Sequence, residues 1–220
     1  MKTTLRPIVL ATAVILATPF VAQADFSANI GVTSNYLWRG QPQSSDEAGI
    51  SGGVDYSHKS GFYAGTWVSS LGGGSNYEQD WYLGYNFKLS SVDLDAGYIK
   101  YTYPIGNATL DFDEIYLNAS MGKFNAGLAY TVNKEGNPAD ENDLYIFVGA
   151  EFEIKKGVTL GVTVGRYNYE APATKDLTNL NLSLSKDDFT FALDKTNATD
   201  SGAGENDPRF SVSWSKSFDL

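Results

Sequence analysis

Apolar and polar side chains alternate along most of the chain, and residues 48–70 show the pattern most plainly. Ile50, Val54 and Tyr56 alternate with serine, glycine and aspartate, and the alternation resumes through residues 62–69. A period of two places successive side chains on opposite faces of an extended strand. The residues between the two runs, 58–61, have the length of a hairpin turn and include a glycine that tolerates positive φ. This stretch therefore predicts a β-hairpin with one apolar face.

The same unit recurs, and the alternation predicts twelve strands. They are 26–37, 49–57, 62–70, 80–89, 92–103, 112–121, 124–132, 144–154, 158–167, 177–185, 189–196 and 209–218. Short and long connections follow each other in strict alternation. Transmembrane barrels have tight turns at one end and longer loops at the other, whereas a β-sandwich has no reason to sort its loops in this way.

One face of most strands is nearly free of charge, and the other carries the charged side chains. These are Asp55, Lys88, Asp93, Asp95, Glu151, Glu153 and Asp194. A basic side chain facing lipid at the membrane midplane costs about 2–4 kcal/mol, so we expect the uncharged face to contact lipid. Unpaired backbone groups at a sheet edge find no water there, which requires the sheet to close.

The predicted fold is therefore all-β: a single closed antiparallel up-and-down transmembrane β-barrel of about 12 strands within residues 25–220. A soluble barrel with the apolar face packed inside is the alternative. Aromatic residues, among them Tyr36 and Trp38, cluster near strand ends, and some of these residues are expected to form interface girdles.

The first 24 residues have the features of a cleaved secretory signal. Lys2 and Arg6 precede a mainly apolar stretch, and Ala22-Gln23-Ala24 matches a cleavage site. Residues 1–24 contain two of the 16 basic residues and none of the 26 acidic ones, so the remaining chain has a formal charge of −12. Such an acidic chain lacks the basic surface that a sequence-independent nucleic-acid binder needs. Cysteine is absent, which excludes disulfides and cysteine-based metal sites.

A family resemblance is found near the start of the mature chain. Residues 35–44 read Asn-Tyr-Leu-Trp-Arg-Gly-Gln-Pro-Gln-Ser, and similar matches follow at 53–58 and 61–67. Together they resemble the opening signature of the TorF family of proteobacterial outer-membrane porins, and residues 98–104 resemble a weaker mid-chain pattern. The resemblance implies a β-barrel with a pore and names no solute. Many outer-membrane barrels end on an aromatic residue that the barrel-assembly machinery reads; here Phe218 precedes the last two residues.

The sequence contains few residues that could form a catalytic site or bind a cofactor. His58 is the one histidine, and it lies in a predicted tight turn beside Ser57 and Ser60. A serine hydrolase needs a nucleophile, a base and an orienting group together, and a histidine-based zinc site needs more ligands. We therefore expect no enzyme activity, no metal and no cofactor.

The charged residues of the predicted lumen are the candidates for function. They are Arg39, Asp55, Lys88, Asp93, Asp95, Lys100, Glu151, Glu153, Arg166 and Asp194. Rings of carboxylates favour cations in pores. Arg39 is expected either to pair with Asp46 or Glu47 in its own loop, which we favour, or to project over the lumen as a constriction charge.

Two functions follow from this reading. The first is an outer-membrane porin for passive diffusion of small hydrophilic solutes, with a preference for cations. The second is a non-conducting structural or adhesion barrel that acts through its external loops, because barrels of about eight strands are filled while those of about sixteen leave a channel. The expected partners are outer-membrane lipid and lipopolysaccharide, small hydrophilic solutes and the assembly machinery, with no nucleic acid.

Overall fold

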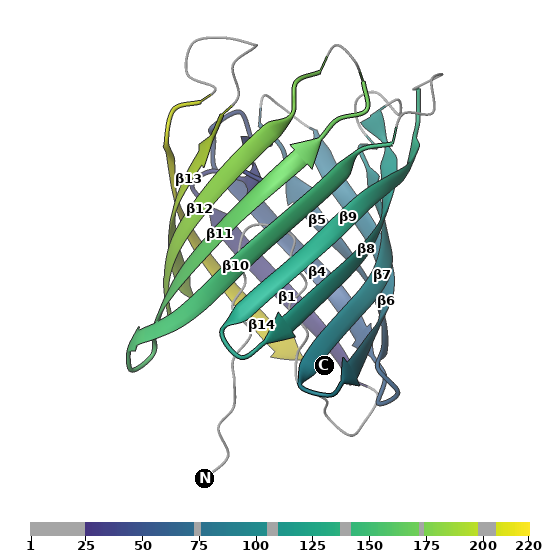
Figure 1. The fold of residues 1–220 in the computed structure, drawn as a ribbon, viewed down its shortest axis with the longest axis vertical. Helices are drawn as coiled ribbons and strands as arrows, with labels where there is room; N and C mark the ends of the chain where they lie inside the picture. Colours follow the sequence, from purple (N-terminus) through teal and green to yellow (C-terminus); the bar gives the residue numbers. More distant parts are fainter. Residues whose placement is uncertain (1–24, 73–75, 105–109, 137–141, 172–173, 198–205) are drawn as a thin grey trace.

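The computed structural model describes residues 25–72, 76–104, 110–136, 142–171, 174–197 and 206–220. Within these residues, twelve antiparallel strands close into a barrel whose strands are tilted to its axis (Figure 1). They are β1 (Asp25–Thr33), β4 (Gly49–Ser57), β5 (Phe62–Ser70), β6 (Tyr77–Leu89), β7 (Val92–Thr102), β8 (Phe112–Met121), β9 (Phe124–Lys134), β10 (Leu144–Lys155), β11 (Val158–Asn168), β12 (Leu177–Lys186), β13 (Phe189–Thr196) and β14 (Arg209–Asp219). The predicted signal, residues 1–24, lies outside the described residues.

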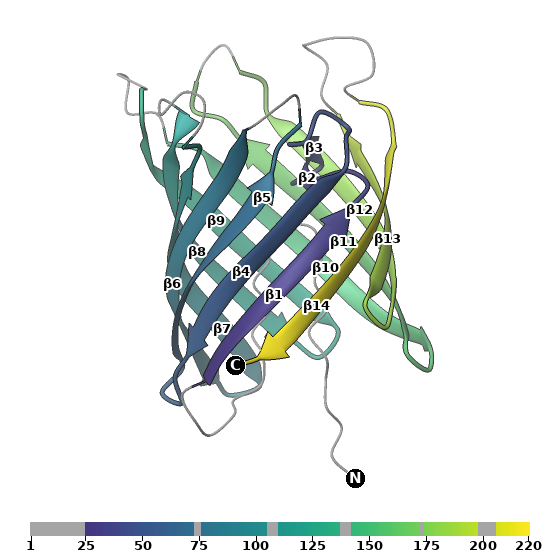
Figure 2. The same ribbon diagram turned by 180° about the vertical axis from the view of Figure 1, so that it is seen from behind.

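Each strand from β4 to β14 pairs with its neighbours in sequence, and β1 completes the ring by pairing with both β4 and β14 (Figure 2). Asp25 lies opposite Ser57, and Ser27 lies opposite Asp219. The start of β1 and the end of β14 therefore lie at the barrel end that carries the short turns, and the longer connections lie at the other. The predicted closed twelve-stranded barrel is confirmed. No helix in the described residues is long and apolar enough to cross a membrane.

The short turns each contain one residue in the left-handed region of φ. These residues are Gly61, Ser90, Gly122, Gly157 and Asp187. Tight hairpin turns need positive φ so that their twist matches that of the strands. The turns hold the register in which the apolar faces of neighbouring strands coincide.

The predicted apolar face points outward. Ile50 is 64 % exposed, Trp81 52 % and Leu83 50 %, which would be costly in water for so many large side chains. The outward face of the barrel therefore forms the belt expected for contact with lipid. The soluble alternative, with this face packed inside, is wrong.

Aromatic rings on the inward face lie over glycines of neighbouring strands. A Cβ at Gly65 would lie 2.5 Å from Cε2 of Tyr82, so only glycine leaves room for the ring. The pairs are Tyr82 on Gly65, Tyr63 on Gly84, Tyr116 on Gly97, Phe147 on Gly127 and Tyr145 on Gly165. The rings cover a wall that glycine would otherwise leave without side chains, and they narrow the lumen.

The first strand is shorter than predicted. β1 ends at Thr33 rather than at residue 37, because the Thr33 hydroxyl donates to the Asn35 carbonyl (2.8 Å) and the backbone turns away from the sheet. Tyr36 and Leu37 are then buried inside the barrel at 5 % and 2 % exposure. Tyr36, one of the candidates for an interface girdle, is therefore not part of one.

Candidate functional site

Residues 34–48, here called the inner loop, connect β1 to β4 and fold into the barrel (Figure 2). The inner loop contains a small hairpin in which β2 (Leu37–Trp38) pairs with β3 (Gln41–Pro42). The two turn residues, Arg39 and Gly40, have φ of 51° and 78°. Positive φ at both central positions is typical of a two-residue type I′ turn. The turn places Arg39 inside the barrel.

The tip of the inner loop contacts several walls of the lumen. A Cβ at Gly40 would lie 2.8 Å from Cγ2 of Thr196 on β13. The Trp38 ring packs edge-on against Tyr101 of β7 at a centroid distance of 5.8 Å, and lies 5.9 Å from the ring of Tyr167 on β11. The inner loop therefore reaches across the lumen from β1, and Trp38 is not part of an interface girdle.

Arg39 forms a two-pronged ion pair with Glu114 of β8. Nη1 donates to Oε1 at 2.8 Å and Nη2 to Oε2 at 2.7 Å, with side-chain exposures of 10 % and 1 %. Burial alone would lower the pKa of the Arg39 guanidinium, but the Glu114 carboxylate outweighs it and raises the pKa above its ordinary value. Arg39 therefore stays charged at any physiological pH, and the paired geometry fixes its orientation.

Three aromatic rings surround the Arg39 guanidinium. Its Cζ lies 4.1 Å from the ring centroid of Trp38, 4.3 Å from that of Tyr145 and 5.1 Å from that of Tyr167. Cation–π contacts strengthen when the cation is desolvated, as it is here. The inner loop is therefore held by both charge and ring contacts at its tip.

A second set of contacts holds the base of the inner loop. Asn35 Nδ2 donates to Oδ1 of Asp46 at 2.6 Å, and Arg209 Nε donates to the same oxygen at 2.8 Å. The hydrogen bond from Arg209 lowers the pKa of the Asp46 carboxyl below its ordinary value. The Tyr36 hydroxyl donates to Glu78 of β6 at 2.8 Å. The favoured expectation that Arg39 pairs with Asp46 or Glu47 is thus wrong: Asp46 pairs with Arg209, and Arg39 lies inside the lumen.

Most of the charged residues predicted for the lumen lie on the inward face. They are Asp55, Lys88, Asp93, Asp95, Glu151, Glu153 and Asp194. Near the short-turn end, Lys88 Nζ lies 2.9 Å from Asp93 Oδ1 in an exposed pair, and Glu153 accepts a hydrogen bond from the Gly157 amide at 2.9 Å. These charges form the rim of the lumen at that end.

Deeper in the lumen, tyrosines donate to the carboxylates. The Tyr63 hydroxyl donates to Asp95 at 2.6 Å, and Asn118 Nδ2 donates to the same carboxylate at 3.4 Å. The Tyr82 hydroxyl donates to Asp55. Hydrogen bonds of this kind satisfy buried carboxylates without a basic partner, so this side of the lumen, from β4 to β8, is filled by an acidic network.

Two candidates, Lys100 and Arg166, do not face the lumen. Lys100 has the same parity as the outward residues of β7, and its Nζ lies 3.7 Å from Asp113 Oδ1 and 3.3 Å from Glu135 Oε1. Arg166 is on the outward face of β11 and pairs with Asp176 at 2.6 Å. Both lie at the long-loop end, where long basic side chains reach the polar boundary of a membrane.

Three buried acids of the lumen were not among the predicted site residues: Glu78, Asp80 and Glu114. They are 2 %, 2 % and 1 % exposed. Glu78 lies in a region predicted as loop, because β6 begins at Tyr77 rather than at residue 80. Glu114 shares the inward parity of Tyr116, which was the available signal, but a register shift between Asp113 and Glu114 interrupts the pattern at the strand start.

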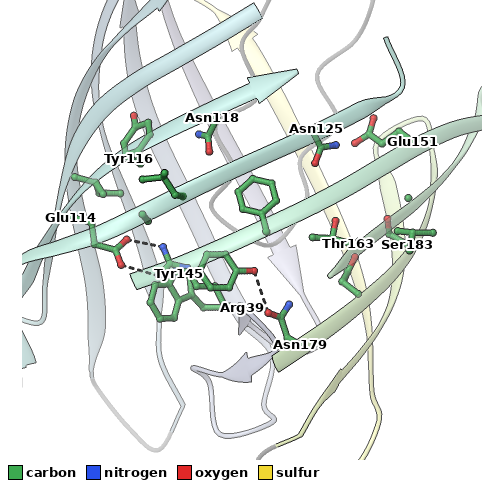
Figure 3. Close-up of a pocket in the computed structure, with 18 of the residues that line it drawn as sticks. Arg39, Glu114, Tyr116, Asn118, Asn125, Tyr145, Glu151, Thr163, Asn179 and Ser183 are labelled. Atoms are coloured by element: carbon green, nitrogen blue, oxygen red, sulfur yellow. Dashed lines mark hydrogen bonds and ion pairs between the residues drawn. The ribbon is translucent and has the colours of Figure 1, made fainter. Parts of the chain in front are cut away.

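A cavity of about 70 Å³ lies next to Arg39 on the β8–β12 side (Figure 3). Trp38, Tyr116 and Phe147 contribute ring surface to its lining. Its polar lining residues are Arg39, Glu114, Asn118, Asn125, Glu151, Thr163, Asn179, Asn181 and Ser183. The cavity therefore combines aromatic surface with amide, hydroxyl and carboxylate groups.

His58 lies, as predicted, in the exposed turn between β4 and β5, where Nδ1 and the Ser60 hydroxyl are 2.9 Å apart. Among the described residues, no group of three or more histidine, cysteine, aspartate or glutamate side chains is arranged to hold a metal ion.

The sequence model of Gcw_chp, a bacterial family of unknown function, matches residues 18–202. No curated protein is similar enough in sequence to count as a relative. Among solved structures, the KdgM porin is similar over 87 % of this chain and 99 % of its own, with 14 % identity and a TM-score of 0.57. The NanC porin is similar over 87 % and 97 %, with 12 % identity and a TM-score of 0.50. At such identities the likeness concerns the fold.

Proposed function

The chain belongs to the Gcw_chp family of bacterial proteins of unknown function, and we propose that it is a narrow outer-membrane porin for passive diffusion of small hydrophilic solutes. One observation supports this most: a closed barrel that is apolar outside and polar inside has a charged inner loop across its lumen. A loop of this kind sets the width and the field of a pore. The porin fold of KdgM and NanC supports the same function.

We propose that the pore prefers cations. Carboxylates outnumber basic groups on the inward face of the described strands, and the Arg39 charge is balanced by Glu114. A further structure of the KdgM porin is a complex with disordered oligogalacturonate, a polyanion (TM-score 0.54, 12 % identity). An acidic lumen would repel such a solute, so a preference of that kind is not proposed for this chain.

The remaining proposals concern the cellular setting. Residues 1–24 would be a cleaved signal for export, and the barrel would be inserted in the outer membrane by the barrel-assembly machinery and contact lipid and lipopolysaccharide. Membership of the TorF family remains a proposal that rests on residues 35–67. Transport through such a pore has no catalytic step and needs no cofactor.

Conductance in planar bilayers tests the main proposal. The refolded protein should give stable single channels, and a salt gradient should give a reversal potential of the sign expected for cations. Anion-selective current would refute the proposed selectivity, and absence of current from folded protein would refute the porin.

A second function is supported by the same inner loop. Because Arg39 is held inside the lumen by Glu114 and three rings, the barrel would be non-conducting if the inner loop blocked the lumen and never moved. It would then be a structural or adhesion protein that acts through its external loops. The conductance measurement separates the two functions.

A further inference from the structure

The wall of the cavity beside Arg39 contains a buried hydrogen-bond acceptor that the described part of the chain leaves without a donor. Asn181 is 5 % exposed; its Nδ2 donates to both oxygens of Asp194 at 2.9 and 3.0 Å, while its Oδ1 has no partner. A buried amide oxygen without a donor costs about 1–3 kcal/mol. The polar wall around Asn181 is therefore incompletely satisfied by the protein itself.

Further polar groups converge on the same space from neighbouring strands. A Cβ at Gly149 would lie 2.5 Å from Asn125 Oδ1 and 3.0 Å from Thr163 Oγ1, so both side chains lean over this glycine of β10. Figure 3 shows Asn125, Glu151, Thr163 and Ser183 grouped at one end of the cavity. Among the described residues, no side-chain partner of Asn125 or Thr163 is found.

Glu151 supplies the negative charge of this group. It lies opposite Gly161 of β11, which in turn lies opposite Ser183 of β12. A Cβ at Gly161 would lie 2.5 Å from Ser183 Oγ, so the Ser183 hydroxyl leans over this glycine, which separates it from Glu151. No basic side chain among the described residues pairs with Glu151, because Arg39, the cation of the lining, is engaged by Glu114.

We propose that this cavity is a subsite for a small solute that carries a protonated amine and several hydroxyl groups. The inference rests on the proposed porin function and names the solute class of that pore. The ammonium group pairs with Glu151, hydroxyl groups donate to Asn125 Oδ1 and exchange hydrogen bonds with Thr163 and Ser183, and the apolar face of the solute packs on Phe147. A solute with a carboxylate in place of the amine is repelled by the Glu151 carboxylate. It cannot pair with Arg39, because Arg39 is already paired with Glu114.

Three solutes with three carbon atoms, 2-amino-1,3-propanediol, glycerol and glycerate, match the small cavity and test the proposal at pH 6, where the amine is protonated. Their binding to detergent-refolded protein is measured by tryptophan fluorescence, since Trp38 lines the cavity, and by inhibition of ion current in bilayers. We expect aminopropanediol to bind about tenfold more tightly than glycerol, the factor that one charge-assisted contact provides, and glycerate to bind more weakly than glycerol. Equal affinity for aminopropanediol and glycerol would refute the proposal.

Variants locate the effect. Glu151→Gln should reduce the preference for aminopropanediol over glycerol to about one, whereas Glu135→Gln, the same change at the long-loop end outside the cavity, should preserve it. Gly161→Ala, whose new methyl group would meet only the rotatable Ser183 hydroxyl at 2.5 Å, should weaken the binding of all three solutes and leave the fold intact by circular dichroism. Persistence of the preference in Glu151→Gln would refute the assigned role. Fluorescence binding without current would refute the porin function and leave the subsite standing.

Discussion

Replacement of Glu114 by glutamine tests whether the ion pair with Arg39 holds the inner loop in the lumen. Glutamine has nearly the same shape but no charge, and its amide group cannot accept from both Nη atoms. Removing one partner of a buried ion pair costs about 3–5 kcal/mol, since the other charge stays buried without compensation. Here Glu114 is 1 % exposed on its side chain and Arg39 10 %, so the buried case applies.

The three ring contacts of Arg39 remain in the variant and offset part of that cost, because each cation–π contact contributes about 0.5–2 kcal/mol. A net loss of about 2 kcal/mol then raises the population of the displaced inner loop roughly thirtyfold. Single-channel recording should show this as more frequent transitions to a wider, higher-conductance state.

Unchanged conductance and unchanged transition frequency in Glu114→Gln would refute the role of the pair. Glu135→Gln removes a carboxylate that pairs with Lys100 outside the lumen, and it should behave as wild type. A double-mutant cycle with Arg39→Gln checks the coupling: the double variant should differ little from either single variant, since both remove the same interaction.

Three further predictions concern the barrel and the base of the inner loop. Gly65→Ala places a methyl group 2.5 Å from the Tyr82 ring and should lower the free energy of unfolding by about 1–3 kcal/mol in urea titrations. Leu83→Lys, on the outward belt, should cost about 2–4 kcal/mol in the same titration in lipid vesicles but little in binding assays of the lumen. Asp46, whose pKa is lowered by the hydrogen bond from Arg209, contributes fully above its ordinary pKa of about 3.9 and loses its contribution as pH falls below that value. Channel transitions should therefore increase in this acidic range, and Asp46→Asn should show the increase already at neutral pH.

The alternation of side chains was sufficient to predict the barrel, because a period of two is imposed by strand geometry itself and the membrane makes the penalty for a misplaced charge large. It also placed Asp55, Asp95 and Asp194 inside. It failed for Lys100 and Arg166, although their parity with Tyr98 and Val164 was readable, since long basic side chains near a strand end reach the polar boundary at low cost.

The inner loop could not be predicted from the same pattern. Tyr36 and Trp38 keep the parity of the apolar residues of β1, and only three-dimensional contacts show that they enter the lumen. Arg39 is held by Glu114, 75 residues further along the chain. The residues around Arg39 could not indicate a partner so far away in sequence. The left-handed φ of Arg39 is also unusual for a residue with a side chain, so Gly40 was the one local sign of a turn.

The lumen is asymmetric, and this explains where the inner loop has to act. From β5 to β11, tyrosine and phenylalanine rings line the wall beside inward glycines, whereas the inward face of β14 carries small serines such as Ser211 and Ser213. The tip of the inner loop rests between these two sides, at Asn179 on β12 and Thr196 on β13. From there the side chain of Arg39 reaches Glu114 on β8. The inner loop thus bridges the lumen between its two unlike sides, and its attachment to Glu114 limits the space that is left beside it.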